Sequence, residues 1–118
     1  MKYISSLITV EDINISRKFY EEVMEQTVVN DFGENVSFNG FAIHLKSHYK
    51  KLIDKKEITN AGSNFELYFE HNNIEQFVEK LKNNKIKFVH ELREQPWKQK
   101  VVRVYDPDNY IVEIGEPM

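Results

Sequence analysis

The sequence repeats one pattern of elements, and its two copies are offset by 61 positions. In each copy, a strand-like apolar run leads to a residue that can cap a helix, and apolar residues then recur at helical spacing. Asp12 and Asn73 are the matching capping residues, and Tyr20 and Leu81 match on the helices. Two copies of one supersecondary unit predict a duplicated fold, in which the two modules pair their sheets around a shared concavity.

The pattern of each copy predicts one strand, then a helix, then three further strands. The Asn39-Gly40 pair is a strong signal for a two-residue turn between the third and fourth strands of the first copy. The lysine-rich residues 46–63 predict a solvated connection that can include one helical turn. The predicted strands cover residues 3–10, 27–31, 35–38, 41–45, 64–70, 86–91, 101–105 and 110–114, and the helices follow Asp12 and Asn72 or Asn73.

The composition narrows the class of protein. A chain of 118 residues with 41% hydrophobic residues is expected to form one domain around one core. A net charge of -3 with mixed charges argues against a nucleic-acid partner. The absence of cysteine excludes disulfides, thiolate metal sites and a thiol nucleophile. No apolar run approaches the roughly twenty residues of a membrane span, and the N-terminus is too short for a signal peptide, so we expect a cytoplasmic protein without a membrane partner.

Residues 94–114 read as a loop followed by a closing β-hairpin. The turn is Asp106-Pro107-Asp108-Asn109, in which Pro107 presets the backbone and Asn109 tolerates a left-handed conformation. The return strand carries one acid, Glu113, among apolar residues. A lone carboxylate in such a strand either faces solvent or points into a cavity that requires a charge.

This closing stretch resembles that of the vicinal oxygen chelate superfamily, which includes glyoxalase I, the fosfomycin and bleomycin resistance proteins, and extradiol dioxygenases. The likeness depends on the Asp-Pro-Asp turn, on a glutamate five residues beyond Asp108, on Pro96-Trp97 and on Arg103. Asn109 stands where the superfamily usually has glycine. The resemblance covers nearly the whole chain. It implies a single glyoxalase-like α+β domain over residues 1–118, in which duplicated βαβββ modules, about 1–48 and 64–118, form a cup-shaped mixed sheet with the helices outside.

The resemblance also implies four metal-ligand positions that face into the cup. Carried onto this chain, they fall on Ser5, His44, Glu66 and Glu113. Serine is a poor ligand, so the implied set is His44, Glu66 and Glu113, which suits Ni, Mn, Co, Fe or Zn. Ordinary alternation in a strand explains outward-facing glutamates equally well, and a lone strand histidine is commonly a core residue.

Three further residues are predicted substrate contacts. The guanidinium of Arg103 would hold a carboxylate, phosphonate or enediolate oxygen, although a surface ion pair is the alternative. Trp97 and Gln99 would form a wall and a polar contact, although Trp97 could instead cover one end of the core. The remaining histidines match no position of the superfamily and are predicted to be surface residues: His48, His71 and His90.

Two functions follow from the resemblance, and the sequence leaves enzyme status open. One is a divalent-metal-dependent lyase or isomerase acting on a small hydroxy-carbonyl compound, with Glu66 or Glu113 as the catalytic carboxylate that moves a proton. The other is a metal-free protein that sequesters a small molecule, like the bleomycin resistance proteins, and needs no cofactor. The resemblance implies a homodimer in either case.

Overall fold

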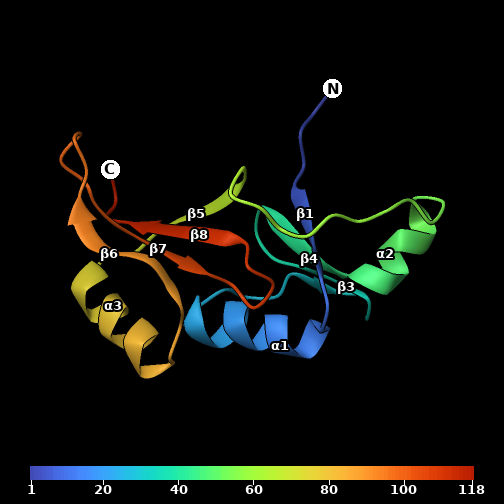
Figure 1. Ribbon diagram of the computed structural model, residues 1–118, viewed down its shortest axis with the longest axis horizontal. Coiled ribbons are helices and arrows are strands. Elements are labelled where there is room, and N and C mark those ends of the chain that lie inside the picture. The colour runs from blue at the N-terminus through green and yellow to red at the C-terminus, as the bar shows by residue number, and fades with distance from the viewer. The chain divides into compact units, whose positions relative to one another are not determined.

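The computed structural model describes residues 1–118 and divides into two compact units, Met1–Asn60 and Ala61–Met118. None of its helices has the length and apolar content of a membrane span. Each unit contains a four-stranded mixed sheet (Figure 1). The elements, in order, are β1 (Ser6–Val10), α1 (Ile13–Lys18), η1 (Phe19–Val23), β2 (Asn30–Asp31), β3 (Asn35–Ser37), β4 (Phe41–Leu45), α2 (Lys46–Leu52), β5 (Glu66–Glu70), α3 (Ile74–Asn83), β6 (Phe88–Glu94), β7 (Lys100–Tyr105) and β8 (Ile111–Gly115).

The first unit is built around a sheet in the order β1-β4-β3-β2, with β1 parallel to β4. Asp12 caps α1, because its Oδ1 accepts hydrogen bonds from the backbone N–H groups of Asn14 and Ile15. The helix continues as the π-helical turn η1, where the N–H of Met24 donates to the carbonyl of Phe19. The fully buried ring of Tyr20 packs against neighbouring phenylalanine rings and anchors this core.

The second unit repeats this plan with the strand order β5-β8-β7-β6 and β5 parallel to β8. Asn73 caps α3 by accepting a hydrogen bond from the N–H of Gln76. The inner face of α3 and one face of the sheet bury the apolar side chains, so the opposite face of the sheet can carry polar groups. The buried apolar residues on this side are Ile74, Phe77, Val78 and Leu81 of α3, and Leu67, Val102, Val104, Val112 and Ile114 of the sheet. Val101 is also fully buried but lies on the opposite face of the sheet, two residues before Arg103 on β7.

The structure confirms the predicted order of elements in both halves and differs from the prediction mainly at their ends. The strand expected at residues 3–10 begins only at Ser6. The strand expected at 27–31 is reduced to Asn30–Asp31, the two residues that pair with Ser37 and Val36 of β3. Lys46–Leu52 forms the seven-residue helix α2 within the predicted connection. Strand ends depend on the partner strand, which local sequence does not specify.

The turn between β7 and β8 is held by a buried carboxylate. Asp106 is 4% exposed, and its Oδ1 accepts hydrogen bonds of 2.9 Å from the N–H groups of both Asp108 and Tyr110. Asn109 adopts the predicted left-handed backbone, with φ of 68°. Because the turn sets the pairing of the two strands, Arg103 lies directly opposite Glu113.

We therefore expect Asp106→Ala to lower the free energy of unfolding by about 2 kcal/mol, because it leaves two backbone donors without their acceptor. Asp106→Asn keeps a side-chain oxygen and should cost clearly less. Urea denaturation followed by circular dichroism measures both values. Equal losses in the two variants would contradict the role of the acceptor oxygen.

Candidate functional site

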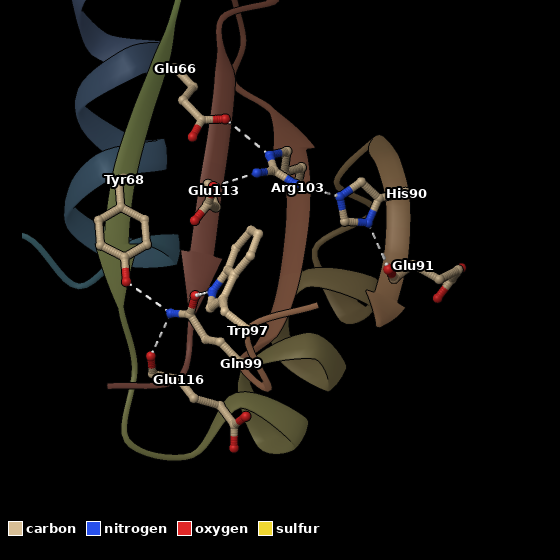
Figure 2. Close-up of polar contacts among 9 residues, drawn as sticks. All are labelled: Glu66, Tyr68, His90, Glu91, Trp97, Gln99, Arg103, Glu113 and Glu116. Carbon is tan, nitrogen blue, oxygen red and sulfur yellow. Dashed lines mark hydrogen bonds and ion pairs between the residues drawn. The ribbon is translucent and has the colours of Figure 1, made fainter. Parts of the chain in front are cut away.

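A single row of cross-strand partners carries four polar side chains across the second sheet. Tyr68 on β5 pairs with Glu113 on β8, Glu113 pairs with Arg103 on β7, and Arg103 pairs with His90 on β6. Figure 2 shows these side chains together with Glu66, which precedes Tyr68 by two positions and so lies on the same face of β5. This polar face lies opposite the apolar face that packs with α3.

Arg103 is the centre of the cluster. Its Nε lies 3.0 Å from Oε1 of Glu66, and its Nη2 lies 2.5 Å from Oε1 of Glu113 (Figure 2). Its Nη1 donates to Nε2 of His90 over 3.1 Å, while Nδ1 of that ring donates to the carbonyl of Glu91. The ring is therefore the neutral tautomer protonated at Nδ1. Three of the five N–H groups of the guanidinium are used, and two remain.

The two carboxylates and the guanidinium influence one another's protonation. Burial raises the pKa of Glu113 above its ordinary value, and neighbouring Glu66 raises it further, so that Arg103 only partly offsets the shift. Burial alone would lower the pKa of Arg103, but Glu66 and Glu113 outweigh it and raise that pKa. With both carboxylates ionised, the cluster carries one excess negative charge.

A second network lies at the end of the polar face. Gln99 is only 5% exposed, and its Nε2 donates to the hydroxyl of Tyr68 over 2.9 Å and to the carbonyl of Glu116 over 2.8 Å. Its Oε1 accepts from the indole Nε1 of Trp97 over 2.7 Å (Figure 2). The hydroxyl of Tyr68 donates in turn to Glu70, over 2.7 Å. Two of the predicted contact residues, Trp97 and Gln99, are thus bonded directly to each other.

Next to this network lies an open hollow of about 440 Å³. Trp97 forms part of its lining and is 54% exposed, although its N–H is already bonded inside the protein. The other lining residues are Lys98, Gln99, Glu116, Pro117 and Met118. The hollow therefore offers both a free aromatic face and charged groups at its rim.

His44 lies in the first unit, on β4, and is 5% exposed. Its Nδ1 accepts from the amide of Asn35 over 2.9 Å, and its Nε2 is 2.8 Å from Nδ1 of His48. Burial lowers the pKa of His44, and His48 lowers it further. His48 is half-buried, which corrects the prediction that it is a surface residue.

The strand pairings show which positions of the two units are equivalent. Ser6 and Leu67 lie 61 positions apart, and they pair with Phe41 and Val112 respectively. Ala42 is therefore the counterpart of Glu113, and His44 is the counterpart of Gly115. The sequence had suggested His44 as the counterpart of Glu113, which is two residues too far along β4. The difference arises because the equivalence of β4 and β8 follows from their pairing with β1 and β5, and this pairing cannot be read from the end of a strand.

The structure contains no group of three or more His, Asp or Glu side chains that could hold a metal ion. Glu66 and Glu113 come together, but both give an oxygen to Arg103. The equivalent positions of the first unit, Ser5 and Ala42, offer a hydroxyl and a methyl group. A guanidinium between two carboxylates occupies the place that a divalent cation would need.

Comparison with known families decides the relationship. The model of the glyoxalase-like domain matches residues 3–118. The chain belongs to the glyoxalase-like domain family. Among curated proteins, no sequence matches it.

Solved structures share the fold of this chain. A protein of unknown function from Agrobacterium tumefaciens is 32% identical, with a TM-score of 0.92, over 100% of this chain and 95% of that one. A glyoxalase-related enzyme from Fulvimarina pelagi is 19% identical, with a TM-score of 0.82, over 99% and 89%. A lactoylglutathione lyase from Agrobacterium tumefaciens is 15% identical, with a TM-score of 0.75, over 98% and 94%. The fold that these structures share with the chain agrees with the resemblance to the vicinal oxygen chelate superfamily, and the family model assigns the glyoxalase-like domain.

In this glyoxalase-like domain, the sequence analysis missed three residues of the polar face. His90 was predicted to be a surface residue but is half-buried against Arg103. Tyr68 and Gly115 were not considered, although alternation along β5 and β8 places them on the same faces as Glu66 and Glu113. Tyr68 is two residues after Glu66, and Gly115 is two residues after Glu113, so the alternation of side chains along each strand predicts both positions.

Because the pKa of Glu113 is raised on folding, the folded state holds this proton more tightly than the unfolded state does. The contribution of Glu113 to stability is therefore greatest at low pH and is lost as the pH rises from about the ordinary value of 4.5 through the raised pKa. We expect the melting temperature of wild type, relative to Glu113→Gln, to fall as the pH rises through that window. Glu79→Gln, on the exposed side of α3, is the matched control. A pH-independent difference would contradict the raised pKa.

Proposed function

We propose that this glyoxalase-like protein binds a small organic cation on the polar face of its second sheet, without a resident metal, and so sequesters it. The observation that carries the proposal is the state of Arg103, which is already paired with both Glu66 and Glu113. A guanidinium with two counter-charges has little remaining attraction for an anion. Its two unused N–H groups can still hold a neutral oxygen of the ligand.

The charge of the surrounding side chains supports a cationic ligand. Glu66, Glu70 and Glu113 lie on this face together with two guanidinium groups, Arg103 and the exposed Arg93 of the edge strand β6, so the carboxylates are in excess by one. Glu113 is also largely buried, so a charge placed beside it interacts through a medium of lower dielectric than water. A positively charged group would favour the ionised form of Glu113 and relieve the cost of burying it.

A divalent-metal-dependent lyase or isomerase is the second candidate, and one observation favours it. The raised pKa of Glu113 suits a carboxyl group that gives or takes a proton beside a carbonyl. In that reading His44, Glu66 and Glu113 would hold Ni, Mn, Co, Fe or Zn. The donor set fits such a metal poorly, because Arg103 lies between the two glutamates and Ala42 stands at the position equivalent to Glu113. The homodimer stays a prediction from the family, and the cytoplasmic location stays a prediction from the sequence.

Two dyes of opposite charge test the proposal: proflavine, a planar cation, and 1-anilinonaphthalene-8-sulfonate, a planar anion. We expect proflavine to raise the melting temperature of the purified protein, with about 2.7 kcal/mol of stabilisation at a hundredfold excess over Kd. The sulfonate should raise it much less. Glu66→Gln should weaken proflavine binding. An equal effect of the two dyes would contradict the cationic site.

Elemental analysis before and after chelator treatment, with a melt of each sample, separates the two candidates. We expect the chelator to leave the melting temperature unchanged. About one Ni, Mn, Co, Fe or Zn ion per chain, together with a lower melting temperature after its removal, would overturn the metal-free proposal in favour of the metal-dependent one.

A further inference from the structure

We propose that Gln99 is a positioning residue, which uses the space left by Gly115 to fix the rings of Trp97 and Tyr68 as walls of the small-molecule site. The fixing of the two rings follows from contacts within the second unit. That the rings belong to a ligand site rests on the function proposed above.

Gly115 makes room for the amide of Gln99. A Cβ atom added to Gly115 would lie 2.4 Å from Nε2 and 3.1 Å from Cδ of Gln99, and 3.5 Å from Cε1 of Tyr68. The first distance is far shorter than a van der Waals contact and the second is slightly shorter, so the amide of Gln99 would have to move. The backbone at this position is that of an ordinary strand, which any residue can adopt. The requirement for glycine here is therefore one of space beside Gln99.

The hydrogen-bonding capacity of the Gln99 amide is directed inward. Both of its N–H groups have acceptors, the hydroxyl of Tyr68 and the carbonyl of Glu116, and its oxygen accepts from Trp97. A buried amide with three partners of this kind is held in one orientation. It has no N–H left for a ligand, so it acts on a ligand through the rings it holds.

The consequence is largest for Trp97. This side chain is half exposed, and exposed side chains normally sample several rotamers. The bond from its Nε1 to Gln99 fixes the edge of the indole and leaves the ring face open beside the hollow. A planar group can then stack on a ring that is already ordered, which removes part of the entropy cost of binding.

The first unit lacks this arrangement. Its counterpart of Gly115 is His44, a residue with a large buried side chain that is hydrogen-bonded to Asn35 and His48. The two halves share a backbone plan but use this position differently. The device that holds the aromatic rings is therefore confined to the second unit.

The loop offers a matched control. The backbone N–H of Gln95 donates to the carbonyl of Gln99, and the N–H of Lys98 donates to the carbonyl of Gln95, so the main chain closes the turn by itself. The side-chain Nε2 of Gln95 is buried without a hydrogen-bond partner. Gln95→Met therefore removes an amide from the same loop without removing a hydrogen bond to Trp97, to Tyr68 or to Gln99.

Trp97 is the one tryptophan of the chain, so its indole N–H gives a single NMR signal. In Gln99→Met and in Gly115→Ala we expect this signal to move and to lose its protection from hydrogen exchange, and acrylamide to quench the indole fluorescence more strongly. Gln95→Met should match wild type. The double variant Gln99→Met/Gly115→Ala should resemble either single one, because both remove the same contacts. Backbone amide spectra confirm that each variant is folded.

Proflavine binding tests whether the ordered rings serve the ligand site. We expect Gln99→Met and Gly115→Ala each to raise the Kd for proflavine about tenfold, because one or two side chains would then have to be ordered on binding. Gln95→Met should leave the Kd unchanged. An unchanged indole signal in folded Gln99→Met would overturn the positioning role. Unchanged proflavine affinity beside an altered indole signal would overturn the placement of the rings in the site. Failure of wild type to bind proflavine would instead overturn the proposed function, and the indole measurements would still decide the role of Gln99.

Discussion

The structure of the second unit depends on how it accommodates one largely buried positive charge. Removing a guanidinium from water costs several kcal/mol unless counter-charges and hydrogen bonds replace the lost hydration. The partners of Arg103 come from three other strands, with Glu66 on β5, Glu113 on β8 and His90 on β6. Glu66 reaches it across the intervening strand β8. The same contacts that satisfy Arg103 therefore join all four strands of the sheet and set the electrostatic character of its polar face.

Most of the fold could be predicted from local patterns. Asp12 and Asn73 cap helices because their side chains satisfy backbone N–H groups within three residues, and such interactions can be read from adjacent sequence. Apolar residues recur at helical spacing after Asn73, and the structure buries four of them on α3. The ends of β1, β2 and β6 were predicted less well, since a strand extends only as far as its neighbour offers partners.

The sequence predicted which residues belong to the candidate site, but it did not predict the contacts between them. Glu66, Arg103 and Glu113 were identified, yet the ion pairs among them could not be, because they depend on how β5, β7 and β8 align across the sheet. His90 shows the difficulty most clearly. The pairing of β6 with β7 is irregular on both sides of this residue, and only those irregularities bring it opposite Arg103. No count along the sequence predicts where a strand is irregular.

The turn held by Asp106 has a consequence for how this chain can vary. Arg103 lies three residues before Asp106, and Glu113 lies seven after it, so their meeting depends on the number of residues between them. Many substitutions within the hairpin would preserve that number. A single insertion or deletion would turn one of the two charges to the apolar face, next to α3. Evolution of the closing hairpin is therefore constrained in length more strongly than in sequence.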